Sequence, residues 1–93
     1  MAMEISYDPA KNAENIARRG LSFDEAARLD FRTAVFAVDD RHDYGETRYR
    51  GFGFLDGRLH ALVFVETGTG IRVVSFRKAN KREVQRYEKA RNP

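Results

Sequence analysis

The hydrophobic positions of this chain follow two different periods. Up to about residue 30 they recur every three or four positions, which predicts helices, and from Thr33 to Arg77 they alternate with polar residues, which predicts strands. The first helix is predicted over Pro9–Arg19. Asp8 stands at its N-cap position, proline is the first helical residue, and Gly20 stands where a left-handed residue commonly ends a helix.

Two further helices are predicted from capping boxes, in which a polar N-cap residue is paired with a glutamate three positions later. The first box contains Glu25 and predicts a short helix over Ser22–Leu29. The second contains Glu83 and predicts a carboxy-terminal helix over Asn80–Lys89. The last of these helices is strongly basic, and its apolar positions form only a narrow stripe.

Four strands are expected in the middle of the chain, because β-branched and aromatic residues alternate there between turn-like breaks. Their ranges are Thr33–Val38, Thr47–Leu55, Arg58–Glu66 and Ile71–Arg77. The pair Asp56-Gly57 is a two-residue hairpin signal, so the last three strands should form an antiparallel meander. Residues Met3–Tyr7 can add a short strand. The predicted architecture is α+β, with two amino-terminal helices, a four-stranded mainly antiparallel sheet and one carboxy-terminal helix.

Length and composition limit the classes of function. The 93 residues suffice for a single domain over residues 1–93. The absence of cysteine excludes disulfides, thiolate metal sites and a cysteine nucleophile, and no apolar run has the length that a membrane helix needs. We therefore expect a cytoplasmic protein that does not interact with membranes.

The net charge of +3 is unevenly distributed. From Arg72 onward the chain has eight Lys or Arg and two acidic residues, whereas the preceding part carries an excess of acid. A basic segment of this kind attracts a polyanion such as RNA or DNA, or an acidic protein. Charge alone does not choose among these partners.

The second predicted strand combines cations with aromatic rings. Alternation places Arg48 and Arg50 on one face together with Phe52 and Phe54. In proteins that bind single-stranded RNA, such a face supplies a track for the backbone and rings for base stacking. Alternatively the two phenylalanines pack under a helix, which leaves the arginines as the binding candidates. The two intervening glycines then face the other way and allow another backbone to approach closely, or mark a bulge.

The last predicted strand carries a cation near each end. Alternation puts Arg77 on one face with Val73 and Ser75, and Arg72 on the opposite face with Phe76. The two guanidinium groups are therefore not expected to act together. A guanidinium beside a basic helix can hold a phosphate with two parallel hydrogen bonds. The alternative is that both are ordinary solvated charges at strand ends.

The connection between the first two predicted strands gathers acids around one imidazole. His42 or Glu46 can serve as a general base. Asp39, Asp40 and Asp43 can in principle hold Mg²⁺, which would make the protein a metal-dependent nuclease. The alternative is a solvated, mobile connector, with or without a role as a lid.

No established catalytic motif is present in the chain. It contains no Gly-rich phosphate loop, no Gly-x-Ser-x-Gly elbow and no His-Glu-x-x-His motif. The remaining enzymatic option is phosphodiester cleavage without a metal or other cofactor. In that reaction a ribose 2′-hydroxyl attacks the neighbouring phosphate, and clustered Arg and Lys offset the charge that grows on the phosphate oxygens.

Several blocks of the sequence resemble the BrnT family of toxins. They are Tyr7–Lys11, Asn15, Arg18–Ala26, Gly45–Tyr49 and Ile71–Ala79, followed by Glu83 and Tyr87. Their order and spacing together are more specific than any one block. The chain also departs from the family pattern, with Arg19 where the family often has His and Thr67 where Arg is common. A histidine base at position 19 is therefore excluded.

The resemblance implies a toxin of a bacterial type II toxin–antitoxin module with a RelE-like ribonuclease fold. It implies neutralisation by a BrnA-type antitoxin encoded alongside, whose dimer binds operator DNA and two toxins, so that the assembly is a heterotetramer. The family's two arginine positions fall on Arg48 and Arg77, the first candidates for phosphate binding. The second candidates are Arg72, Lys78 and Tyr87, and the expected RNA-binding cations are Arg50, Lys81 and Arg82.

These considerations leave two main hypotheses. One is an endoribonuclease toxin that cleaves RNA without a metal and inhibits growth. The other is a binding module without catalysis, in which the same cations hold nucleic acid or an acidic antitoxin. The second hypothesis predicts salt-sensitive binding to intact RNA and no cleavage products.

Overall fold

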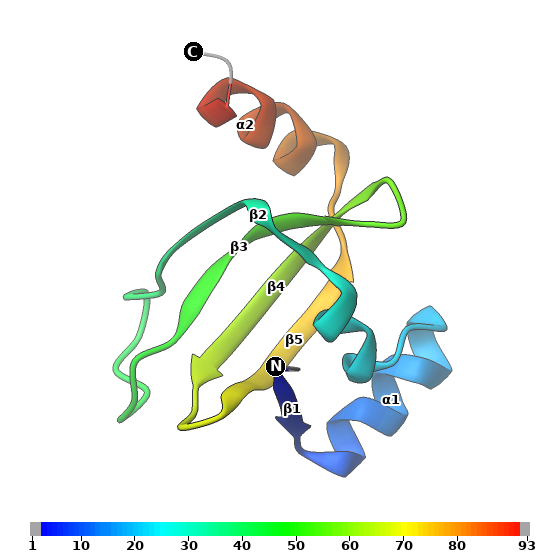
Figure 1. The fold of residues 1–93 in the computed structure, drawn as a ribbon, viewed down its shortest axis with the longest axis vertical. Coiled ribbons are helices and arrows are strands. Elements are labelled where there is room, and N and C mark those ends of the chain that lie inside the picture. The colour runs from blue at the N-terminus through cyan, green and yellow to red at the C-terminus, as the bar shows by residue number, and fades with distance from the viewer. Residues whose placement is uncertain (1–2, 92–93) are drawn as a thin grey trace.

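The computed structural model describes residues 3–91, which form a five-stranded sheet with three helical elements around it (Figure 1). In chain order the elements are β1 (Glu4–Tyr7), α1 (Pro9–Arg19), the 3₁₀ helix η1 (Phe23–Arg28), β2 (Asp30–Val38), β3 (Tyr49–Leu55), β4 (Arg58–Glu66), β5 (Gly70–Lys78) and α2 (Lys81–Arg91). The strand order across the sheet is β1-β5-β4-β3-β2. The α+β class and the carboxy-terminal helix are confirmed, whereas the four-stranded sheet and the pair of amino-terminal α-helices are wrong.

The short strand considered over Met3–Tyr7 is confirmed as β1, the fifth strand, at the edge of the sheet. It pairs in parallel with β5, with Ile5 opposite Ile71 and Tyr7 opposite Val73, while the other three strand pairs are antiparallel. Ile5 and Tyr7 pack against the hydrophobic core. A strand of four residues gives only two alternations, which is a weak sequence signal, and its partner lies far away along the chain.

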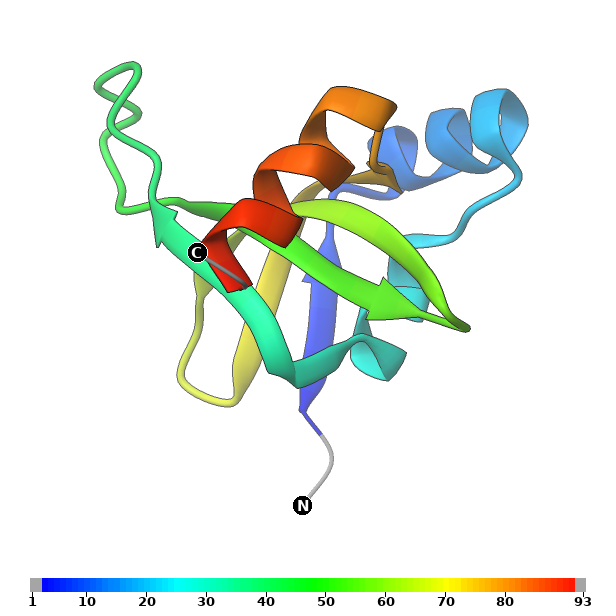
Figure 2. The same cartoon turned by 90° about the horizontal axis from the view of Figure 1, so that it is seen from above.

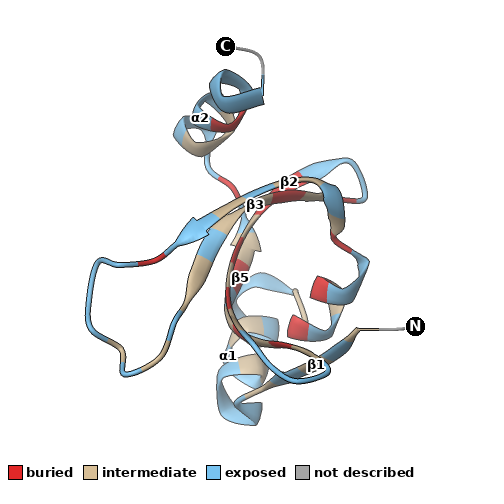
Figure 3. Cartoon of the chain, turned by 60° about the vertical axis from the view of Figure 1, so that its left-hand side comes forward, coloured by how far each residue is buried: buried red, intermediate tan, exposed pale blue. Residues whose placement is uncertain are grey.

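The predicted caps of α1 are confirmed. The Asp8 carboxylate accepts a hydrogen bond from the Ala10 N–H, and Gly20 adopts the left-handed conformation with φ of 65°. The helix contacts the body of the protein through asparagines. Asn12 accepts a hydrogen bond from the Phe23 N–H, and Asn15 donates to two backbone carbonyls, those of residues 21 and 76. The apolar stripe of α1 therefore faces solvent (Figure 3).

The second predicted helix is a 3₁₀ helix, η1. Ser22 does cap it, but the hydroxyl accepts from the Asp24 N–H rather than from residue 25, so the capping box is incomplete. Phe23, Ala26 and Leu29 are all buried against the sheet. A spacing of three places side chains directly above one another in a 3₁₀ helix, which suits a single narrow contact with the sheet.

The hydrophobic core has two parts, one on each face of the sheet. The larger part surrounds Leu62, Val73 and Phe76, the largest fully buried side chains, and includes η1. The smaller part lies under α2, which covers the other face (Figure 2), and it includes Phe52 and Phe54. The prediction that these phenylalanines pack under a helix is confirmed.

Helix α2 is anchored by its first turn and by one tyrosine. The Asn80 side chain accepts from the Glu83 N–H at 2.8 Å, and the Glu83 carboxylate accepts from the Asn80 N–H at 2.9 Å, so the second capping box is confirmed. Tyr87 is buried, and its hydroxyl donates to the Thr33 carbonyl of β2 at 2.7 Å. Among residues 3–91, no helix is long and apolar enough to cross a membrane.

Several strand boundaries differ from the prediction. Strand β2 begins at Asp30 rather than Thr33 and contains a register shift between Asp30 and Val35. Strand β3 begins at Tyr49, because the preceding two residues belong to the β2–β3 loop. Gly53 of β3 faces Leu29, where a β-carbon would come within 2.8 Å of the leucine side chain. The predicted close approach of another backbone is confirmed at Gly51 instead, where a β-carbon would collide with the Val35 carbonyl oxygen of β2.

A bulge in β5 overturns the prediction that Arg72 and Arg77 lie on opposite faces. Val63 of β4 pairs with Ser75, and the next residue along β4 pairs with Val73, so Val74 has no partner. The extra residue reverses the alternation after it. Phe76 consequently lies in the larger core with Val73, and both arginines lie on the α2 face.

Candidate functional site

A groove of about 480 Å³ lies on the α2 face of the sheet, between α2 and the β2–β3 loop. Its floor is formed by β3, β4 and β5. Five arginines line it, at positions Arg41, Arg48, Arg50, Arg77 and Arg86. Only two acids line it with them, Asp39 and Glu83. A smaller hollow beside the groove shares Arg48 with it and adds Arg72 and Lys11 together with one acid, Asp8, so cations outnumber acids in the lining of both.

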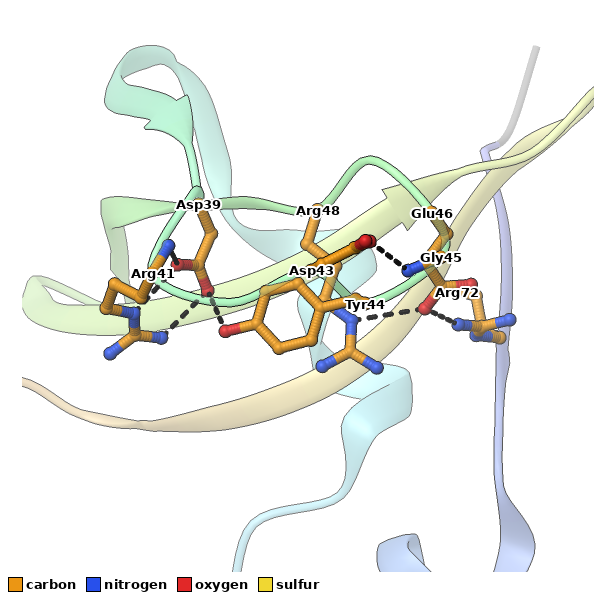
Figure 4. Close-up of polar contacts among 8 residues, drawn as sticks. All are labelled: Asp39, Arg41, Asp43, Tyr44, Gly45, Glu46, Arg48 and Arg72. Atoms are coloured by element: carbon orange, nitrogen blue, oxygen red, sulfur yellow. Dashed lines mark hydrogen bonds and ion pairs between the residues drawn. The ribbon is translucent and has the colours of Figure 1, made fainter.

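Glu46 joins two of the arginines predicted for the site (Figure 4). One carboxylate oxygen, Oε2, accepts from Arg48 Nε at 3.1 Å and from Arg72 Nη2 at 2.6 Å. Both hydrogen bonds lower the pKa of the Glu46 carboxyl below its ordinary value, and the bond from Arg72 has the larger effect. Glu46 is therefore ionised at neutral pH and holds the two guanidinium groups beside each other.

Asp39 organises the β2–β3 loop from its buried end. Both of its oxygens accept from Arg41, at 2.7 and 2.8 Å, and the Tyr44 hydroxyl donates to it at 3.3 Å. The Arg41 guanidinium holds the pKa of the Asp39 carboxyl well below its usual range. The Tyr44 ring in turn lies 4.1 Å from the Arg48 guanidinium carbon, in a cation–π contact. The loop thus presents one aromatic face and two arginines to the groove.

The acids of this loop do not converge on a metal site. Asp39 is bonded through both oxygens to Arg41, and Asp43 accepts from the Gly45 N–H at 3.0 Å. Within the part of the chain that the structure describes, no three acidic or histidine side chains are grouped so as to hold a metal ion. The arrangement therefore gives no support to the hypothesis of a metal-dependent nuclease that uses Asp39, Asp40 and Asp43.

Arg77 is held at the other side of the groove by Glu83. The two side chains form a bidentate pair, with Nη1–Oε1 and Nη2–Oε2 distances of 2.7 and 2.9 Å. The pair lowers the pKa of Glu83 to about 2 and raises the pKa of Arg77 above its ordinary value. Because Glu83 also caps α2, the position of Arg77 is coupled to the start of that helix.

The structure brings only some of the predicted residues together. Arg50 lies in the groove, exposed, and makes no ion pair or side-chain hydrogen bond with the described residues. His42 is exposed on the loop, with its ring centroid 5.7 Å from that of Tyr44. The cations on either side of the β5–α2 connection are exposed and do not line the groove; they are Lys78, Lys81 and Arg82.

Tyr87 lines the groove with its ring, but its hydroxyl is already bonded to the Thr33 carbonyl. Sequence reasoning missed Tyr44, Arg41 and Arg86. The i, i+2 spacing of Asp39 and Arg41 was the one available signal, because such a pair can close a short turn. Nothing local indicates that Tyr44 turns toward Arg48, since irregular loops have no period.

The arrangement is suited to binding a phosphodiester. Guanidinium groups offer paired N–H donors to phosphate oxygens, and three of the predicted arginines, Arg48, Arg72 and Arg77, line the groove or the hollow beside it. An aromatic ring beside them provides a surface for a nucleobase. The groove can therefore recognise both the backbone and the bases of a nucleic acid strand.

Comparison with known proteins gives one clear result. A family model described as the ribonuclease toxin BrnT of type II toxin–antitoxin systems matches residues 7–83. Searches among curated proteins and among solved structures gave no match. The family match covers well over half of the chain and includes the loop, both arginine strands and Glu83. The chain therefore belongs to the BrnT family of ribonuclease toxins of type II toxin–antitoxin systems.

Proposed function

We propose that this toxin is an endoribonuclease that cleaves RNA without a metal ion. The observation that carries the proposal is the placement of Arg48 and Arg77 in one groove on the α2 face, with Arg72 on the same face in the hollow that adjoins it. The ribose 2′-hydroxyl loses its proton, and its oxygen attacks the neighbouring phosphorus. The bond to the 5′-oxygen breaks, and that oxygen takes up a proton. The products are a 2′,3′-cyclic phosphate and a 5′-hydroxyl.

The arginines act on the charge of the phosphate. Negative charge grows on the non-bridging oxygens as the fifth bond to phosphorus forms, and guanidinium groups already in place stabilise it. Arg48 and Arg72 bind these oxygens from one side, and Arg77 from the other. Arg50 holds an adjacent phosphate, and the Tyr44 ring stacks on a base.

Glu46 and His42 take different roles in this proposal. A carboxylate bonded to two arginines is a weak base, because the arginines stabilise its ionised form. Glu46 is therefore a positioning residue that orients Arg48 and Arg72. His42, on the same loop, is the candidate proton acceptor.

The partner of this toxin is proposed to be a BrnA-type antitoxin, in a heterotetramer of two toxins and two antitoxins in the cytoplasm. Membership of the type II family implies an antitoxin, and the basic carboxy-terminal segment favours an acidic binding surface on it. Operator DNA is then bound through the antitoxin rather than by the toxin.

The test is incubation of antitoxin-free protein with end-labelled RNA in excess EDTA, with identification of the new termini. Cyclic phosphate ends that Arg48→Ala and Arg77→Ala both abolish would support the proposal. Arg32→Ala is the matched control, because Arg32 is a highly exposed arginine on β2 and should leave cleavage unchanged. Melting curves establish that each variant is folded.

Intact RNA in EDTA would overturn metal-independent cleavage of free RNA. If Mg²⁺ then restored cleavage, the protein would be a metal-dependent nuclease. If Mg²⁺ had no effect but RNA still bound in a salt-sensitive way, the binding module without catalysis would replace the proposal.

A further inference from the structure

Strand β2 is an unusual sheet edge. It is the last strand in the order and pairs only with β3, so the backbone groups along its outer side have no strand partner among residues 3–91. The described residues include four exposed large hydrophobic side chains, and three of them lie on β2: Phe31, Val35 and Val38, with 38%, 37% and 54% exposure. The fourth, Ile16, lies on α1.

The part of this edge from Val35 to Val38 also lacks the usual protection against pairing, whereas Asp30, Arg32 and the register shift lie before it. Natural edge strands are commonly protected by charged side chains, by proline or by a covering loop. From Thr33 to Val38 this strand has neither a charge nor a proline. Its register with β3 is regular from Val35 to Val38, so the segment is straight enough to accept a neighbour.

The exposed side chains lie on both faces of the sheet. Val35 and Ala37 line the groove on the α2 face. Val38 pairs with Tyr49, whose ring packs in the core of the opposite face, and Phe31 contacts Phe36 on that same face. A helix laid on one face would cover only one of these sets. A strand added beside β2 covers both.

We propose that the β2 edge binds an extended, acidic and apolar segment of the antitoxin as a sixth strand. This rests on the proposed function only in taking an antitoxin as the partner. Strand addition satisfies the free backbone groups, and alternate apolar side chains contact the exposed valines. Ala37 pairs with Arg50, and both residues line the groove. An acidic side chain of the added strand that lies next to Ala37 on this face therefore points toward the groove.

Charge favours an acidic partner over a second copy of this chain. Helix α2 packs against β2 through Tyr87 and Thr33. It carries five basic residues, at positions Lys81, Arg82, Arg86, Lys89 and Arg91, against two acidic ones, Glu83 and Glu88. Symmetric pairing of two β2 edges brings these like charges toward each other, whereas an acidic segment is attracted to them.

The test measures binding of the full-length antitoxin encoded alongside to the toxin and to two variants. Val38→Lys places a charge on the edge and should weaken binding about tenfold or more, as for a central contact of an interface. Ile16→Lys is the matched control and should bind normally. Hydrogen exchange of the complex should show new protection of the amides of residues 35–38. RNA cleavage by both variants, measured without antitoxin, should equal that of the wild type.

The outcomes separate this proposal from the proposed function. Normal binding by Val38→Lys, or weakened binding by Ile16→Lys alone, overturns the β2 site while RNA cleavage still supports the ribonuclease. A toxin dimer that Val38→Lys dissociates assigns the edge to a second copy. Antitoxin binding without protection of residues 35–38 overturns strand addition. If the wild-type toxin bound the antitoxin but did not cleave RNA, the ribonuclease proposal would be overturned and the β2 site would be unaffected.

Discussion

Replacement of Glu83 by Gln tests how strongly the groove depends on the Arg77–Glu83 pair. Glutamine keeps an acceptor for the Asn80 N–H at the start of α2 but removes the charge opposite Arg77. A pKa of about 2 against an ordinary 4.5 corresponds to about 3 kcal/mol of stabilisation at neutral pH. The Arg77 side chain is 34% exposed, so solvent screens the pair, and we expect a loss of about 2 kcal/mol.

The pH dependence of this loss has a definite sign. The pKa of Glu83 is lower in the folded state, so its contribution is fully present above pH 4.5 and disappears as the pH falls toward 2. Urea unfolding at several pH values should therefore show that the difference between wild type and Glu83→Gln falls to less than half of its neutral value by about pH 3.

A matched control separates the pair from general charge effects. Glu88 lies on the same helix and is exposed, so Glu88→Gln makes the same change in net charge without breaking the pair. It should alter the free energy of unfolding by less than about 0.5 kcal/mol. A Glu83→Gln difference that stays constant from pH 7 to pH 3, or one no larger than that of Glu88→Gln, would show that the Arg77–Glu83 pair does not stabilise the folded protein.

Three further predictions concern the groove and the partner. Glu46→Gln should lower kcat for RNA cleavage about tenfold and leave the acidic limb of the pH–rate profile in place; loss of that limb would make Glu46 the base. Tyr44→Ala should weaken RNA binding by roughly 1–3 kcal/mol and Tyr44→Phe should not, because the ring is retained; equal effects in a filter-binding assay would exclude stacking. Saturating antitoxin should raise the melting temperature of the toxin by at least about 5 °C, as mass action requires, and an unchanged temperature would contradict the partnership.

The local features of the fold could be predicted because the interacting residues are close together in the chain. The Asp8 cap, the left-handed Gly20 and the Asn80–Glu83 box all depend on contacts within a few residues. The prediction that Phe52 packs under a helix is equally local. It rests on alternation along β3, and no bulge interrupts the pairing of β3 with β4. Local alternation also assigned Arg48 and Arg77 to strand faces, but their choice as first candidates rested on the resemblance to the BrnT family.

The candidate site depended on contacts between distant segments. The bulge at Val74 is visible only when β5 is paired with β4, and it is this bulge that brings Arg72 to the face of Arg77. The contact of Glu46 with Arg72 crosses 26 residues of sequence. Alternation along a single strand cannot show either feature, because the neighbouring strand supplies the register.

The helix ends, the strand pattern and the basic segment could therefore be read from the sequence, because they follow from local hydrogen bonding, periodicity and charge. The choice of Arg48 and Arg77 followed instead from the family resemblance. The tertiary structure decided that residues 23–28 form a 3₁₀ helix against the sheet and that β1 joins β5. It also decided that Arg72 and Arg77 lie on the same face of the sheet. Each of these outcomes depends on packing and strand pairing between segments that are far apart in the sequence, so the local sequence pattern does not predict it.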